Sequence, residues 1–174
     1  MDRGPSTVDI ICYNTYLPGM TSLLQAELKQ TRPFPSAATE ALLSILRTAA
    51  LLDHDLSDAL KPFGITSTQH NVLRILRGAG AAGLCGREVA ERMVASVPDV
   101  PRMLERLEAM QLITRERDPG DRRHVTARIT PAGRQLLTRV TPEIEAVEQR
   151  RLGHVSGRTL ASLISGLAAV RGAR

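Results

Sequence analysis

The sequence predicts a mainly α-helical fold that carries one small β-hairpin. Apolar residues recur at spacings of three and four over most of the chain, which predicts a series of amphipathic helices. One stretch departs from this pattern, because Val125, Ala127 and Ile129 alternate with polar residues as a half-buried strand requires. A second short apolar run, Leu112-Ile113, precedes it, and Pro119-Gly120 supplies the residue types of a tight turn. We therefore expect a hairpin with a charged tip.

Three helices are expected in the first 93 residues. A long one follows the N-cap Ser36 and ends at the stretch KPFG. Thr66 and Gln69 form the T-x-x-Q pattern of a capping box, which opens the second helix. A short third helix, GREVAERM, begins after Cys85. Its apolar side is expected to comprise Val89, Ala90 and Met93.

Three further helices surround the hairpin in the sequence. The one before it has Pro98 at a position that the first turn of a helix tolerates. Thr130-Pro131 predicts the start of a long helix toward Leu152, which Pro142 is expected to kink. The last helix runs from Ser156. The helix before the hairpin is expected to bury Val100, Met103, Leu104, Leu107 and Met110, and the last helix carries a stripe of Leu160, Leu163, Ile164 and Leu167.

Composition narrows the class of protein. The formal net charge is +5 and the pI is about 10.0, which permits an anionic partner. Only Lys29 and Lys61 are lysines, so 21 of the 23 basic residues are arginines, which suit phosphate and guanine recognition or reflect codon bias. Aromatic residues make up 2%, which disfavours stacking on single-stranded bases.

The sequence also indicates the compartment. Two cysteines cannot build a disulfide framework, and no apolar stretch reaches the length of about eighteen residues that a membrane span needs. The first twenty residues lack the apolar core of a secretory signal. We therefore expect a cytoplasmic protein without a membrane segment.

Two helices joined by a tight turn and followed by a charged hairpin describe a winged helix-turn-helix, whose second helix enters the major groove of DNA. In that helix, Asp99, Arg102 and Arg106 share the face opposite the apolar stripe. Arg102 suits a phosphate or a guanine. Asp99 either accepts from a cytosine amine or stabilises the start of the helix. The alternative for the arginines is a solvated face on which they pair with Glu105 and Glu108.

The hairpin tip, or wing, carries Arg117, Arg122 and Arg123, which a structural turn does not need. An arginine at such a tip fits the narrow minor groove, where the potential is most negative. Asp121 is placed to orient Arg123 through a charge-assisted pair. The alternative is a salt-bridged surface loop that contributes less than about 1 kcal/mol and has no function.

The segments ITSTQHNVLRIL, GREVAERM, VPDVPRMLERLEAMQLITRERDPGDRR and ITPAGRQLL closely resemble the MarR-type regulators, named for multiple antibiotic resistance, over about Ser36 to Val170. The resemblance implies a homodimer with interlocked terminal helices that binds pseudo-palindromic double-stranded DNA. It also implies a repressor released by a small anionic aromatic ligand or by thiol oxidation. The effector pocket is expected between the dimerisation helices and the DNA-binding lobe.

The residue pattern and the resemblance together divide the chain into domains, and the resemblance adds roles for some site residues. An N-terminal extension, expected to be partly disordered, covers residues 1–33, and Met20 within it is an alternative start. The dimerisation region is expected to comprise residues 34–64 and 131–174. The winged helix-turn-helix lobe is expected to comprise residues 65–130. Asp121 and Arg123 match the family's wing pair, and residues 97–102 match the start of its DNA-reading helix. Three departures are Pro101 in place of Thr or Ser, Cys85 in place of a hydroxyl cap, and Val97, which cannot cap a helix.

Other functions lack a motif. The four histidines show no ligand spacing, and no nucleotide loop or nucleophile motif occurs, so we expect no metal, no cofactor and no enzymatic activity. Cys85 at a helix start is a redox candidate, because cysteines at the N-terminal end of a helix are often reactive. Two alternatives therefore remain beside a ligand-released repressor: a regulator switched by thiol oxidation, and a degenerate member that acts as a protein-interaction module without specific DNA reading.

Overall fold

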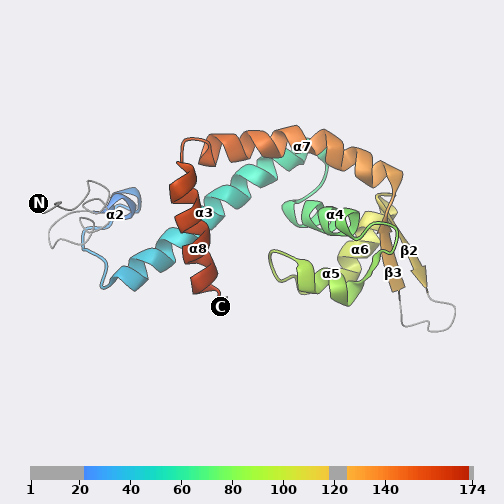
Figure 1. Ribbon diagram of the computed structural model, residues 1–174, viewed down its shortest axis with the longest axis horizontal. Coiled ribbons are helices and arrows are strands. Elements are labelled where there is room, and N and C mark those ends of the chain that lie inside the picture. Colours follow the sequence, from blue (N-terminus) through green and yellow to red (C-terminus); the bar gives the residue numbers. More distant parts are fainter. Residues whose placement is uncertain (1–21, 118–124, 173–174) are drawn as a thin grey trace, which may run out of the picture. The chain divides into compact units, whose positions relative to one another are not determined.

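The structure is a computed structural model in which residues 22–117 and 125–172 are described (Figure 1). It consists of helices and one small antiparallel sheet, which confirms the predicted fold class. The chain forms two compact units that divide between Leu51 and Leu52, inside the long helix α3 (Ala37–Leu60). Within the described parts of the chain, no helix is both long and apolar enough to cross a membrane.

The first unit contains a short helix that the sequence pattern does not predict. This helix, α2 (Leu23–Glu27), begins where the Ser22 hydroxyl accepts a hydrogen bond from the Gln25 amide at 3.1 Å. Five residues are too few to show a helical period, which explains why the pattern did not reveal it. The following helix, α3, starts as predicted, since the Ser36 hydroxyl accepts from the amide of Thr39 at 3.1 Å.

The second unit contains the other predicted elements in the predicted order. The short 3-10 turn η2 (Lys61–Phe63) leads into α4 (Ser67–Ala79), and the predicted capping box is present: Thr66 and Gln69 exchange hydrogen bonds of 3.2 and 2.9 Å. The remaining helices are α5 (Gly86–Arg92), α6 (Val100–Ala109), α7 (Pro131–Leu152) and α8 (Gly157–Val170). The helix α7 continues through Pro142.

The predicted hairpin consists of β2 (Ile113–Arg117) and β3 (Val125–Ile129), which pair antiparallel. Its inward residues Ala127 and Ile129 are buried, as the alternation predicts. The turn predicted at Pro119-Gly120 lies outside the described residues. A third strand, β1 (Leu84–Cys85), pairs with the other edge of β3, so that the strand order is β1-β3-β2. Two residues show no alternation, and the sequence therefore does not reveal β1.

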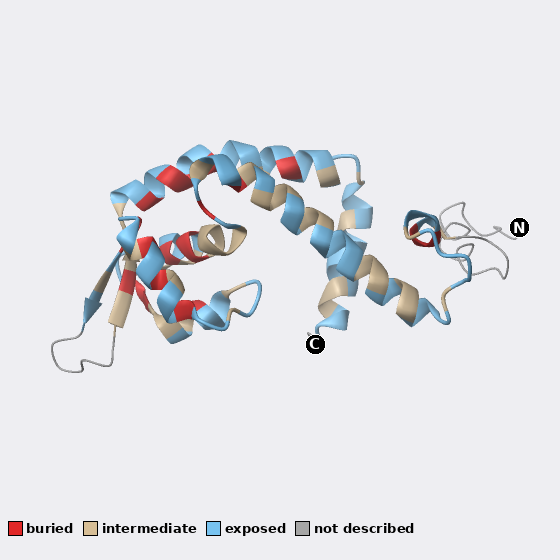
Figure 2. Ribbon diagram, turned by 180° about the vertical axis from the view of Figure 1, so that it is seen from behind, coloured by how far each residue is buried: buried red, intermediate tan, exposed pale blue. Residues whose placement is uncertain are grey.

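One hydrophobic core joins α4, α5, α6, α7 and the sheet (Figure 2). The start of α7 packs so closely that a Cβ at Gly133 would clash with the backbone carbonyl of Leu112, which explains why glycine stands there. Two residues predicted to be apolar contacts are exposed instead. Met110 is 41% exposed because α6 ends at Ala109, and Ala90 lines an open groove.

Candidate nucleic-acid interface

The start of α6 is fixed by Asp99. Its carboxylate accepts a hydrogen bond from the amide of Arg102 at 2.9 Å, so the capping role is the one observed. The helix therefore begins at Val100, and the expectation that Pro98 lies in its first turn is wrong. Pro101 occupies that turn instead, where an amide would have no partner within the helix. Pro101 thus lacks the hydroxyl of the Thr or Ser that the family usually has at this position, but its missing amide costs α6 no hydrogen bond within the helix.

The two arginines of α6 are exposed, and neither forms an ion pair among the described residues. The acids of the same helix pair elsewhere. Arg115 of β2 donates from its Nε to Glu108 Oε2 at 2.8 Å and from its backbone amide to Glu108 Oε1 at 3.1 Å. Its guanidinium also lies 3.6 Å from Glu105. Arg102 and Arg106 are therefore not neutralised by Glu105 and Glu108, contrary to the alternative that these charges form one self-paired face.

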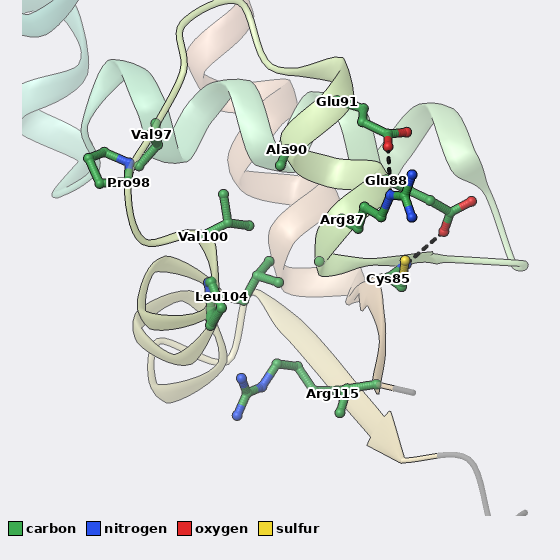
Figure 3. A pocket seen from close by; sticks show the side chains of 13 residues that line it. Cys85, Arg87, Glu88, Ala90, Glu91, Val97, Pro98, Val100, Leu104 and Arg115 are labelled. Atoms are coloured by element: carbon green, nitrogen blue, oxygen red, sulfur yellow. Dashed lines mark hydrogen bonds and ion pairs between the residues drawn. The ribbon is translucent and has the colours of Figure 1, made fainter. Parts of the chain in front are cut away.

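An open groove of about 970 Å³ runs beside α6, between α5 and the sheet (Figure 3). On its α5 side, Arg87 donates from its Nε to Glu91 at 2.9 Å, and the backbone amide of Cys85 donates to Glu88 at 2.8 Å. Cys85 is half-buried and stands at the N-cap of α5. The groove thus brings together the start of α6, the cysteine and the base of the wing.

Val97 precedes the cap of α6 and packs against the hydrophobic core. Together with Pro98 it lines the large groove and also a second hollow of about 390 Å³. This second hollow reaches from the start of α4 to Arg102 and Arg106. Two hollows thus border the exposed face of α6, and the loop between α5 and α6 lines both of them.

The base of the wing is held by a charge pair across the hairpin and by a hydrogen bond to the loop before β1. Arg128 of β3 donates to Glu116 of β2 at 2.6 Å and to the backbone carbonyl of Ala81 at 2.8 Å. Arg117 ends β2 and is exposed. The predicted wing residues Asp121, Arg122 and Arg123 lie outside the described residues.

A mainly apolar cavity of about 370 Å³ lies between the second half of α3, α4, the loop after α5 and α7. This position, with α3 and α7 on one side and α4 on the other, lies between the expected dimerisation helices and the expected DNA-binding lobe. Its polar side chains on α4 include His70, Asn71 and Arg74. Burial lowers the pKa of His70, and the neighbouring charges of Arg74 and Arg77 lower it further. The apolar lining includes Leu52, Leu56, Leu60, Ile144, Val147 and Leu152.

A cluster of charges next to this cavity joins α3 to α7. The carboxylate of Asp55, which is only 11% exposed, accepts from Arg151 at 2.7 and 3.0 Å and from Arg150 at 3.1 Å. These hydrogen bonds hold the pKa of Asp55 far below its ordinary value, and the bonds from Arg151 have the largest effect. Arg151 lines the cavity but is already engaged by Asp55. Across residues 22–117 and 125–172, no cluster of three or more histidine, cysteine or acidic side chains suits a metal ion.

Comparison with known proteins agrees with this geometry. Residues 65–125 match the model of the MarR family. The transcriptional regulator HosA of Escherichia coli O111:H- is 31% identical over 104 residues, which cover 60% of this chain and 71% of that protein. The crystal structure of a MarR transcription factor from Planctomyces limnophilus is 30% identical, with a TM-score of 0.62 over 79% of this chain and 99% of that one. The chain belongs to the MarR family.

A further likeness concerns the fold alone. BpsR from Bordetella bronchiseptica, whose DNA binding is regulated by 6-hydroxynicotinic acid, superposes with a TM-score of 0.70 at 23% identity, over 82% of this chain and all of that chain. The members of the MarR family are transcription regulators with a winged DNA-binding helix rather than enzymes. The chain is accordingly a DNA-binding transcription regulator.

Two features of this MarR-family chain were not predicted. Arg115 was not singled out, because its partners Glu105 and Glu108 lie across the turn between α6 and β2 and share no helical spacing with it. The polar residues of the cavity were not assigned either. His70 and Arg74 stand four residues apart on one face of α4, but that spacing alone does not separate a cavity wall from a solvated face.

Removal of the Asp55 carboxylate should destabilise the protein in a pH-dependent manner. Because the folded-state pKa of Asp55 is lowered, its contribution is present above the unfolded pKa near 3.8 and is lost as the pH falls below that value. We expect Asp55→Asn to melt at a lower temperature than wild type at pH 7, with the difference shrinking below about pH 4. Circular dichroism melts between pH 3 and 7 measure this.

Asp58→Asn is the matched control for that change. Asp58 lies on the same helix, has a side chain that is 66% exposed, and has His54, at 3.6 Å, as its only ion-pair partner among the described residues. Its substitution should change stability by less than about 0.5 kcal/mol. Equal melting temperatures for Asp55→Asn and wild type at pH 7 would show that the charge cluster does not stabilise the protein.

Proposed function

We propose that this chain is a dimeric, sequence-specific repressor that a small anionic ligand releases from DNA. The observation that carries the DNA-reading part is the charge arrangement of α6. Arg115 engages Glu108 and lies near Glu105, while Arg102 and Arg106 remain exposed without an ion pair among the described residues. Arginines in this state bind phosphate or guanine without first breaking an internal pair.

Different residues are assigned to the two grooves of DNA. The segment that enters the major groove comprises Val97, Asp99, Arg102 and Arg106. In it, Asp99 caps the helix and the two arginines contact DNA. The wing that reaches the minor groove comprises Arg117, Asp121, Arg122 and Arg123. For the last three residues this assignment rests on the sequence alone. Each half of a pseudo-palindromic operator then receives one α6 and one wing.

The test is fluorescence anisotropy with the DNA upstream of the gene and a scrambled duplex of equal length, across a salt series. Wild type should prefer the native duplex by about 10³ or more. Arg102→Ala should weaken binding to it by about tenfold, since a bidentate guanine contact discriminates by about 1–3 kcal/mol. If Arg102 contacts phosphate instead, both duplexes should lose affinity and the salt slope should fall by about one.

Arg139→Ala provides the control, because Arg139 is an exposed arginine of α7 and its loss changes the net charge equally. It should leave the preference for the native duplex unchanged. Equal, steeply salt-dependent binding of wild type to both duplexes would mean phosphate attraction alone, and would favour a degenerate member without specific reading.

The dimeric state is supported by apolar side chains that the single chain leaves exposed. None of the residues of α8 is buried, and Leu163, Ile164 and Val170 are 48%, 66% and 71% exposed. In the first unit, Leu42 and Leu46 of α3 are each 57% exposed. Exposed apolar stripes of this kind mark a protein interface. A second copy of this chain is the proposed partner.

Analytical ultracentrifugation at micromolar concentration should detect a dimer for wild type. Ile164→Glu places a charge in the exposed stripe of α8, so we expect a monomer that binds the native duplex at least tenfold more weakly, since burying an unpaired charge is unfavourable. Leu23→Glu is the control, because Leu23 is 86% exposed but lies in α2, outside the proposed dimerisation helices. A wild-type monomer would contradict the proposal.

The ligand part rests on the cavity beside α4. Its volume of about 370 Å³ and apolar lining fit a small aromatic body. Arg74 is exposed, lines the cavity and forms no ion pair among the described residues, whereas Arg151 is engaged by Asp55. Arg74 is therefore the proposed partner of a ligand carboxylate, and His70, whose pKa is lowered, supplies a neutral imidazole beside it.

Isothermal titration calorimetry with benzoate, the simplest aromatic carboxylate, tests this assignment. Arg74→Ala should weaken benzoate binding by about tenfold or more, because a hydrogen bond to a charged group contributes about 1.5–3 kcal/mol. Arg77→Ala removes the same charge from the same helix but lies outside the cavity lining, so it should change the affinity far less. Equal effects of the two substitutions would refute a specific role for Arg74.

A further inference from the structure

The loop between α5 and α6 is shared by two sites. Its first residues, Met93, Val94 and Ala95, line the apolar cavity beside α4. Its last residues, Val97, Pro98 and Asp99, line the hollow next to Arg102 and Arg106. Because Asp99 is also the N-cap of α6, the position of this loop determines where the DNA-reading helix begins. A single irregular segment therefore separates the proposed ligand site from the proposed DNA site.

One side chain fixes the middle of this loop. The backbone amide of Val94 donates to Oδ1 of Asn71 at 3.1 Å, across 23 positions in the sequence. Among the described residues, this is the only hydrogen bond that residues 94–98 form. The side chain of Val94 is 91% exposed and contributes almost no packing. The loop is otherwise held at its ends, where Met93 and Val97 pack against the core.

We propose that Asn71 is a positioning residue for the DNA-reading helix, which it holds in place through Val94. This inference rests on the proposed function, because it assigns a role within the proposed DNA and ligand sites. Asn71 also lines the cavity, so the residue that steadies the loop borders the space that a ligand would occupy. A ligand that draws the Asn71 oxygen away from Val94 would thereby loosen the start of α6 without touching DNA.

Two variants separate positioning from simple structural support. Asn71→Ala removes the acceptor, and the Val94 amide then bonds to water because this hydrogen bond lies at the surface. Asn71→Asp keeps an oxygen acceptor at the same position and should restore the wild-type behaviour. Ser22→Ala is the matched control: it also removes one side-chain acceptor of a backbone amide at 3.1 Å, but in α2.

Two readouts are measured on the full chain. The first is hydrogen exchange of the Val94 amide, which should be roughly two- to tenfold faster in Asn71→Ala, as expected for the loss of one net hydrogen bond. The second is anisotropy with the native and scrambled duplexes. Asn71→Ala should weaken native binding by a similar factor of roughly two to ten and leave scrambled binding unchanged. Asn71→Asp and Ser22→Ala should match wild type in both.

The outcomes are distinct. Unchanged exchange at Val94 in Asn71→Ala overturns the inference, as does faster exchange with an unchanged preference for the native duplex. A loss of affinity for both duplexes that Asn71→Asp does not restore also overturns it, because it indicates general destabilisation. If wild type itself shows no preference for the native duplex, the proposed function fails, and that result is visible before any variant is measured.

Discussion

The rotational setting of α6 depends on burial of its apolar stripe. Val100 and Leu104 are each 4% exposed, and Leu107 is fully buried. Burial of each such side chain contributes roughly 1.5–3 kcal/mol, so any rotation of α6 about its axis would expose them at a large cost. With about 3.6 residues per turn, that stripe leaves Arg102 and Arg106 on the solvent side. The hydrophobic core therefore determines which side chains α6 offers to a partner.

The electrostatics of the same helix follow from its contact with β2. An isolated helix of this sequence would bring Arg102 close to Glu105 and Arg106, at spacings of three and four. In the folded chain, Arg115 engages Glu108 through both its side chain and its backbone amide. Arg102 and Arg106 then remain exposed without an ion pair among the described residues. Tertiary packing thus changes a nearly neutral helix into one with a positive outer face.

Local signals in the sequence predicted the parts of the fold that depend on local physics. The capping box at Thr66, the start of α7 at Thr130 and the alternation in β3 each need only neighbouring residues, and all three are present. The start of α6 was misplaced because Pro98 and Pro101 both suit a first turn. The carboxylate of Asp99 decides between them, since it reaches the amide of Arg102.

The remaining features depend on contacts between elements distant in sequence. The pairing of β1 with β3, the engagement of Glu108 by Arg115 and the hydrogen bond from Val94 to Asn71 join residues that no periodicity links. The exposure of Met110 was not predicted either, because it depends on where α6 ends. The left-handed backbone of Gln111, with φ of 60°, turns the chain there, so Met110 does not continue the apolar stripe of the helix. The sequence therefore indicated helix α6 and its exposed arginines but not the contacts that fix its charge and its start.

The junction of β1 and α5 has a consequence for how such a chain can diverge. Strand β1 ends at Cys85 and α5 begins at Gly86, with no residue between them. Insertion of one residue at this junction would therefore turn α5 by about 100° about its axis and withdraw Val89 from the core. The phase of the helix is thus locked to the register of the sheet. Insertions and deletions in this lobe should be confined to its loops, while the junction itself keeps a constant length.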